Sequence, residues 1–151
     1  FVPPMPLADA IRQAEQLGAE AASLAVRGRH AALELGPAAV VDVRFRAQHA
    51  SGARSQQLVH ALRECGVQAQ EPDYPDQIDG AAQLLILTRL PRSDAEEGRR
   101  LAELLERRPE AIVVHTGVPD AAPDHRRLVL AHGGGRTMMR AAAQLMLEGA
   151  R

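Results

Sequence analysis

The run Ala-Ile-Val-Val at positions 111–114 limits the folds open to this chain more than any other stretch. It is apolar on both faces, and such a strand is stable where helices cover both sides, as they do in a parallel sheet. Pro109 ends the helical pattern before the run, and Gly117 ends the strand. The run therefore predicts a central strand of a parallel sheet, with His115 and Thr116 at the end where ligands of such sheets bind.

Short apolar runs alternate with amphipathic helical segments through the rest of the sequence. Helices are predicted at 7–22, 55–65, 93–108 and 137–148, and strands at 23–26, 38–45, 67–70, 83–88, 111–114 and 128–131. This alternation is typical of βα units. We therefore expect an α/β fold, a three-layer α/β/α sandwich whose mainly parallel sheet has about five or six strands and carries helices on both faces.

The length of 151 residues suits one well-buried domain. Residues 1–6 are proline-rich and are predicted to form an extended linker, and residues 7–151 to form the single sandwich domain. The sequence starts at Phe1 rather than at a methionine, so we expect the domain to belong to a longer polypeptide. The first predicted helix carries one apolar stripe, made of Leu7, Ile11, Ala14, Leu17 and Ala21.

The composition excludes several classes of function. The chain has a formal charge of -1, 2% aromatic residues, and 18 basic residues that are all arginine. We therefore expect no nucleic-acid partner, because a basic stripe and stacking aromatic side chains are both lacking, and no chemistry that needs a catalytic lysine. The single Cys65 excludes an internal disulfide and is predicted to be a core thiol. No stretch resembles a membrane span or a signal peptide, so we expect no membrane partner and a cytoplasmic location.

A glycine-rich turn between the last predicted strand and the last predicted helix is one candidate binding site. It runs from His132 through Gly133, Gly134 and Gly135 to Thr137, and the free N–H groups of a helix start can bind an anion. The turn matches neither G-x-G-x-x-G nor G-x-x-x-x-G-K-[ST]. A tight connection in which Thr137 caps the helix, or a contact with another domain, remains an open alternative.

The ionisable residues form no recognisable catalytic or metal-binding motif. The six histidines include no H-x-x-x-H pair and the chain has one cysteine, so we expect neither a metal nor a cofactor. His115 and His132 both follow strands and could be neighbours. Glu96 and Glu97 are predicted to be solvated carboxylates in the first turn of a helix. Asp42 could orient His115 across adjacent strands, although no serine nucleophile completes a triad.

The order of segments from Gln83 onward resembles a known family. The strand QLLILT, the helix SDAEEGRRLAELLERRP, the strands AIVVHTGVPD and RLVLAHGGGR, and the helix AAAQLMLEG follow one another as in the C-terminal α/β-sandwich domain of glycoside hydrolase family 3. The helix at 7–22 is similar to the family's entry into this domain. The resemblance implies that the chain is that domain, that its partner is an N-terminal barrel domain, and that the parent enzyme hydrolyses O-glycosyl bonds of a carbohydrate.

The resemblance also implies what this chain lacks. The family's nucleophile is an Asp of the barrel, and β-glucosidase-like members carry an acid Glu where this chain has Thr88, Arg89, Leu90 and Pro91. The chain is more similar to the β-N-acetylhexosaminidase branch, whose acid/base comes from a barrel loop. We therefore expect no catalytic residue here and no hydrolysis by this chain alone. Candidates for sugar-cleft or domain-interface contacts follow the strand ends: Arg89, His115, Thr116, His132 and Arg136.

Two other functions remain open. The chain could be a stand-alone flavodoxin-like module that binds a phosphorylated small molecule at the glycine-rich turn, through Gly133, Gly134, Gly135 and Thr137. It could also be an oligomerisation domain without a ligand.

Overall fold

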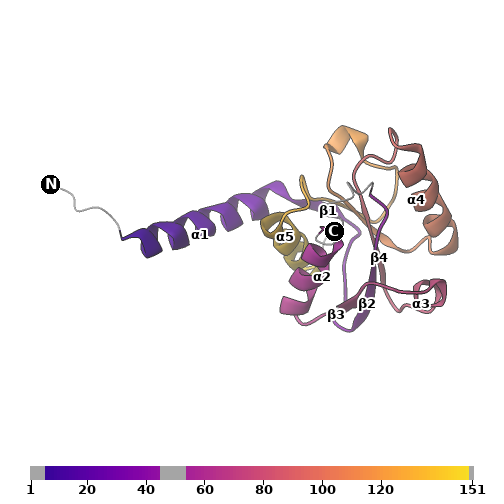
Figure 1. Cartoon of the computed structure of the whole chain (residues 1–151), viewed down its shortest axis with the longest axis horizontal. Coiled ribbons are helices and arrows are strands. Elements are labelled where there is room, and N and C mark those ends of the chain that lie inside the picture. The colour runs from indigo at the N-terminus through magenta and orange to yellow at the C-terminus, as the bar shows by residue number, and fades with distance from the viewer. Residues whose placement is uncertain (1–5, 45–53, 150–151) are drawn as a thin grey trace.

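The computed structural model describes residues 6–44 and 54–149, which form one six-stranded sheet with helices on both sides (Figure 1). The strand order is β1-β6-β5-β4-β2-β3. β1 pairs with β6 in antiparallel orientation, and the other four pairings are parallel. The strands are β1 (Arg27–Arg29), β2 (Pro37–Asp42), β3 (Gln68–Gln70), β4 (Leu84–Thr88), β5 (Ile112–His115) and β6 (Leu128–Leu130).

The helices form two layers, one against each face of the sheet. α2 (Arg54–Glu64), α5 (Arg136–Leu147) and the C-terminal end of α1 (Leu7–Ala25) cover one face, and α4 (Ala95–Arg107) covers the other (Figure 1). Two short elements, α3 (Pro75–Asp79) and the 3₁₀ turn η1 (Pro119–Ala121), lie in connections. The predicted three-layer α/β/α sandwich with a mainly parallel sheet is confirmed.

The two central strands are apolar on both faces, as the sequence predicts. All five residues of β4 and all four residues of β5 are buried. In β4, Leu85 and Leu87 pack in the cluster that contains α2 and α5, whereas Leu84 and Ile86 pack in the cluster on the α4 side. Each such side chain contributes about 1.5–3 kcal/mol by leaving water. The two-sided burial fixes β4 and β5 in the middle of the sheet.

The first strand begins later than the sequence predicts. The predicted strand at 23–26 is wrong, because α1 continues to Ala25 and β1 is Arg27–Arg29. No glycine or proline separates residues 23–25 from the helix, and α1 ends only where Val26 adopts an extended conformation. β1 is polar and lies at the sheet edge, where a strand with little buried surface is tolerated.

Most of α1 is exposed among the residues that the structure describes. The large side chains of its apolar stripe are exposed: Leu7, Ile11 and Leu17 are 76%, 50% and 58% exposed, whereas Ala22 is buried. Figure 1 shows the helix extending away from the sheet, with its last turns beside α5. A single helix is marginally stable in water without tertiary packing, so the stripe needs another surface to be buried.

Some predictions fall outside the described residues, namely residues 1–5 of the linker predicted at 1–6 and the last residue of the strand predicted at 38–45. Within the described residues, no helix combines the length and the hydropathy that crossing a bilayer would require.

Candidate functional site

The strand order places a topological switch point between β2 and β4. From β2 the chain moves outward to β3, and then it crosses back to β4, β5 and β6 on the other side of β2. The connections that leave the carboxyl ends of β2 and β4 therefore diverge. In open parallel sheets, ligands bind in the crevice that such divergence creates.

A pocket of about 440 Å³ lies at this carboxyl edge of the sheet. Its walls come from the segments that follow four parallel strands, together with one residue of α2. We call it the edge pocket, and its lining residues are Arg44, Gln57, Arg89, Thr116, Gly133, Gly134 and Gly135. The volume is within the range of small-molecule sites.

A buried ion pair forms the wall that follows β2. Arg44 is 2% exposed, and its Nε and Nη2 donate to the two carboxylate oxygens of Asp42 at 2.8 and 2.9 Å. The backbone N–H of Arg44 also donates to Asp42, at 2.9 Å. A Cβ atom on Gly134 would lie 2.6 Å from Nη1 of Arg44, so glycine is what allows the turn to approach the guanidinium this closely. The bidentate pair fixes the plane of the guanidinium in the pocket wall.

A buried carboxylate holds the wall that follows β4. Glu97 accepts hydrogen bonds from the Thr88 hydroxyl at 2.6 Å and from the backbone N–H groups of Arg89 and Leu90 at 2.9 and 2.7 Å. The prediction that Glu97 is solvated is wrong, since it is 2% exposed. It sits in the first turn of α4, which begins beside the end of β4, so its side chain reaches the loop rather than water. Glu97 thereby fixes the backbone that carries Arg89 to the edge pocket.

A side chain caps the start of α4. The side chain of Asp94 accepts from the backbone N–H of Glu97 at 2.9 Å. The start of α5 differs, because its N-cap is Gly135 and no side chain caps it. The prediction that Thr137 caps this helix is therefore wrong. The first turn of α5 also carries no acidic residue. Gly135, at the start of this helix, lines the edge pocket, and no carboxylate of the first turn lies near the free N–H groups there.

His115 is fully buried at the end of β5. Its Nε2 is 2.7 Å from the carbonyl oxygen of Val118, and within the described part of the chain its Nδ1 has no hydrogen-bond partner. Burial lowers the pKa of His115, the Val118 carbonyl and Glu97 oppose that shift, and His132 adds to it.

The predicted pairing of Asp42 with His115 is wrong. β4 lies between β2 and β5, so the two residues are not on adjacent strands. The carboxylate of Asp42 is used by Arg44 instead. Within the described part of the chain, Asp42 therefore does not orient His115 as a base.

The sequence-predicted site residues divide into two groups. Those that line the edge pocket are Arg89, Thr116, Gly133, Gly134 and Gly135. Those that do not line it are His115, which is buried, and His132, Arg136 and Thr137, which are exposed on or beside the turn. Sequence reasoning did not propose Arg44 and Gln57, although the alternation of Asp42 and Arg44 on one face of a strand was a visible signal.

The edge pocket has no carboxylate in its wall among the residues described. Across 6–44 and 54–149, no three His, Cys, Asp or Glu side chains gather closely enough to hold a metal ion. Glycoside hydrolysis needs two carboxyl groups on either side of the scissile bond. The described pocket can therefore hold a polar ligand, but it does not supply that pair.

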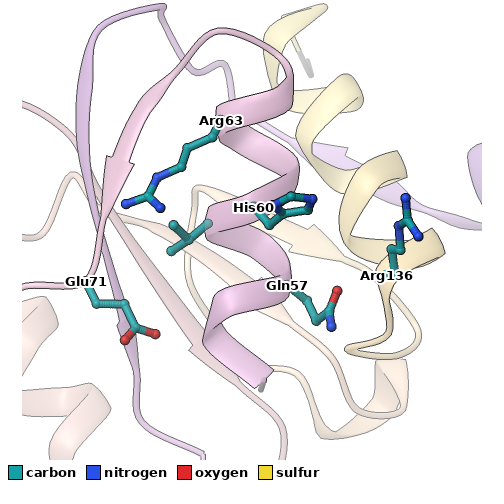
Figure 2. A pocket seen from close by; sticks show the side chains of 6 residues that line it. Gln57, His60, Arg63, Glu71 and Arg136 are labelled. Carbon is teal, nitrogen blue, oxygen red and sulfur yellow. The ribbon is translucent and has the colours of Figure 1, made fainter. Parts of the chain in front are cut away.

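A second pocket, of about 620 Å³, is larger than the edge pocket and is lined mainly by residues of α2. Figure 2 shows Gln57 and His60 on the side of α2 that faces Arg136, whereas Arg63 and Glu71 lie on the other side of the helix. Arg63 already donates to the carbonyl of Ala69 at 2.8 Å. Because α2 separates these polar groups, they do not converge on one ligand, and the edge pocket is the better candidate site.

Comparison with known proteins supports the fold. No family model matches the chain, and no curated protein matches it in sequence. Among solved structures, the chain is similar to a glycoside hydrolase family 3 β-N-acetylglucosaminidase from Paenibacillus sp. str. FPU-7, with a TM-score of 0.66 and 12% identity. It is also similar to a fungal multi-domain β-N-acetylglucosaminidase of the same family, in which a GCN5-related glucosamine N-acetyltransferase region exists, with a TM-score of 0.73 and 11% identity.

The similarity covers nearly all of this chain but a minor part of each neighbour. It spans 100% and 97% of this chain, against 34% of the Paenibacillus chain and 19% of the fungal chain. At such low sequence identity, these matches establish a shared α/β-sandwich fold.

Proposed function

We propose that this chain is a non-catalytic C-terminal domain of a glycoside hydrolase of family 3, of the β-N-acetylglucosaminidase type, and that it packs on a catalytic barrel. The observation that carries the proposal is the pattern of coverage. The whole chain matches 34% of the Paenibacillus enzyme. A domain that corresponds to about a third of an enzyme is expected to work together with the rest.

The exposed face of α1 supports a partner domain. Leu7, Ile11, Leu17 and Leu24 are all at least half exposed, and every residue from 11 to 21 is exposed. A row of large apolar side chains along a projecting helix is typical of an interaction surface. In the proposal, the barrel domain covers this helix.

The edge pocket supports a role beside a sugar cleft rather than in bond cleavage. No described carboxylate lines it, so it lacks the acid and the nucleophile that hydrolysis needs. Arg89, His132 and Arg136 lie on or beside the segments that follow β4 and β6. We propose that these loops contact the sugar or the barrel, with His115 and Thr116 supporting them from the end of β5.

The first test is an assay of this chain on an aryl N-acetylglucosaminide. We expect no turnover by the chain alone. Turnover that is abolished by changing a single residue of this chain would overturn the non-catalytic assignment.

The second test compares two leucine variants in the enzyme that contains the barrel. Leu17→Ser on α1 removes apolar contact with the proposed partner, and Leu35→Ser is a matched control because Leu35 is also exposed, at 68%, but lies outside α1. We expect the α1 variant to lower the melting temperature or the activity of the enzyme and the control to leave both unchanged. Equal behaviour of the two variants would contradict the proposed interface.

A further inference from the structure

We propose that His115 is a pH-sensitive latch for residues 116–121, the segment that follows β5 and carries Thr116 into the wall of the edge pocket. We call this segment the β5 loop. Neutral His115 holds the β5 loop closed on the end of the sheet, and protonated His115 releases it. All the groups that carry this inference belong to this chain, so it does not depend on the proposed partner domain, and either proposal can fail without the other.

The first argument is the hydrogen bonding of the His115 ring. The ring is fully buried, and its Nε2 lies 2.7 Å from the carbonyl oxygen of Val118. A carbonyl oxygen only accepts, so Nε2 carries the hydrogen and Nδ1 is the unprotonated nitrogen. Among the residues that the structure describes, no group forms a hydrogen bond with Nδ1. A proton on Nδ1 would therefore be a buried donor without an acceptor, which is costly, and the closed loop favours the neutral ring.

The charged groups around the ring come from two other elements. Burial lowers the pKa of His115, the Val118 carbonyl and Glu97 of α4 oppose that shift, and His132, which follows β6, adds to it. The Glu97 carboxylate accepts from the Thr88 hydroxyl and from two backbone N–H groups of the loop after β4. These three donors hold the carboxylate in place, so Glu97 moderates the effect of burial on the ring but does not reverse it.

The second argument is the exposure of the β5 loop. Val118, Pro119 and Asp120 are exposed, whereas all four residues of β5 are buried. The N–H of Ala121 also donates to the Val118 carbonyl, at 3.1 Å, but this bond lies within the loop, whereas the bond from His115 ties the loop to the strand. A segment with few buried apolar contacts opens at a lower free energy than the core. Loss of the His115 bond is therefore expected to open the loop without unfolding β5.

The third argument is the contact between the β5 loop and the wall of the edge pocket. Gly117 lies against both the Arg89 backbone and the His115 ring, because a Cβ atom there would collide with the Arg89 carbonyl oxygen and lie 3.2 Å from Cε1 of the ring. Thr116 and Arg89 both line the pocket, and the backbone N–H of Thr116 donates to the Thr88 carbonyl at 2.8 Å. Opening of the loop would therefore alter the wall that Thr116 and Arg89 form.

The direction of the pH dependence follows from the state in which the ring binds a proton more readily. In the open loop the ring meets water and has the ordinary histidine pKa of about 6.5. In the closed loop burial lowers the pKa of His115. The closed loop is thus favoured at neutral pH. Below a pH of about 6.5 the ratio of open to closed loop rises by up to about tenfold for each pH unit, until the pKa of the closed state is reached.

The experiment is an NMR titration of the ¹⁵N-labelled chain from about pH 7.5 to about pH 5. The ring nitrogens of His115 report its protonation directly, and the amide signals of Gly117 and Ala121 report the β5 loop. We expect Nε2 to carry the hydrogen at neutral pH. As the pH falls, we expect the loop amides to exchange with a second state whose population grows by up to about tenfold per pH unit, while the amides of Val113 and Val114 in β5 keep their shifts.

Two histidine variants assign the effect to one ring. His115→Gln keeps a side-chain N–H donor but binds no proton, so we expect the pH dependence of the loop amides to disappear. His125→Gln is the matched control, because Nε2 of His125 also lies 2.7 Å from a carbonyl oxygen, that of Ala111, but His125 is half-buried and lies outside the loop. We expect the control to show the same pH dependence as the wild-type chain.

The wild-type titration alone can refute the latch, even if His115→Gln does not fold. Loop amides that do not change with pH would overturn the proposal, and so would a neutral ring that carries its hydrogen on Nδ1. Amides of β5 that change in step with the loop would also overturn it, because the opening would then be global unfolding. Among the variants, pH dependence that persists in His115→Gln, or that is lost equally in His125→Gln, would contradict the assignment to His115.

Discussion

Replacement of Glu97 by alanine tests how the loop after β4 is held. The Glu97 carboxylate is the acceptor for three donors, the Thr88 hydroxyl and the N–H groups of Arg89 and Leu90, at 2.6 to 2.9 Å. In Glu97→Ala these donors lose their acceptor inside the protein. The loop that carries Arg89 then loses the contacts that this carboxylate provides, and it keeps the hydrogen bond from the Asp94 N–H to the Leu90 carbonyl at 2.8 Å.

The expected loss follows from the burial of each donor. A buried donor left without an acceptor costs about 1–3 kcal/mol. The Thr88 hydroxyl is fully buried and takes the whole penalty, whereas the two N–H groups are half-buried and water can reach them in part. We therefore expect a loss of about 3 kcal/mol in the free energy of unfolding, a large part of the ~5–15 kcal/mol of an ordinary domain.

The assay is urea unfolding followed by circular dichroism at the helical band, with equal slopes required for wild type and variant. Glu96→Ala is the control, because Glu96 is the neighbouring residue on α4 but is exposed and pairs with Arg99 on the surface. We expect the control to leave the unfolding midpoint in place. A Glu97→Ala midpoint equal to that of the control would refute the anchoring role of this carboxylate.

Three further predictions concern the core. Gly98→Ala is expected to destabilise the protein although alanine favours helices, because the added methyl group would clash with the backbone of the loop before α4. Gly18→Ala is the control and is expected to be tolerated, because its methyl group would meet no atom. The melting temperatures of the two variants check this prediction. Burial lowers the pKa of His115 in the folded protein. Below a pH of about 6.5 the unfolded chain therefore binds a proton at His115 more readily than the folded chain does, and the free energy of unfolding should fall as the pH drops. His115→Gln should flatten that pH dependence in urea titrations, and an unchanged slope would contradict this assignment. Arg44→Met leaves the buried Asp42 without its partner and should cost about 3–5 kcal/mol, and a loss below about 1 kcal/mol would show that the pair is not needed.

The strands and helices could be predicted because their patterns are local. The two-sided apolar run at 111–114 correctly predicts a central strand, and Gly66, at a φ of +92°, follows the end of α2 in a conformation that glycine adopts readily. Neighbouring strands and their order are not local properties. The alternation of segments therefore predicts a mainly parallel sheet, but it does not reveal that β1 joins β6 in antiparallel orientation.

The parts of the candidate site that sequence reasoning missed depend on tertiary contacts. Glu97 looks like any first-turn carboxylate until α4 is placed beside the end of β4. Arg44 looks like a polar residue of a strand end until Asp42 and Gly134 surround its guanidinium. The stripe on α1 has the period of a buried helix face, but the surface that would bury it is not in the described chain.

Hydrogen exchange of the α1 amides most directly tests whether this chain is a domain that packs on a partner. The measurement compares residues 7–21 in this chain alone with the same residues in a polypeptide that also carries the proposed barrel domain. The account predicts fast exchange in the chain alone, because these residues are exposed there, and slow exchange when the barrel is present. Equal exchange rates in the two polypeptides would contradict this account. Slow exchange in the chain alone, with protection that increases with protein concentration, would also contradict it, because it would indicate that α1 associates with a second copy of the chain.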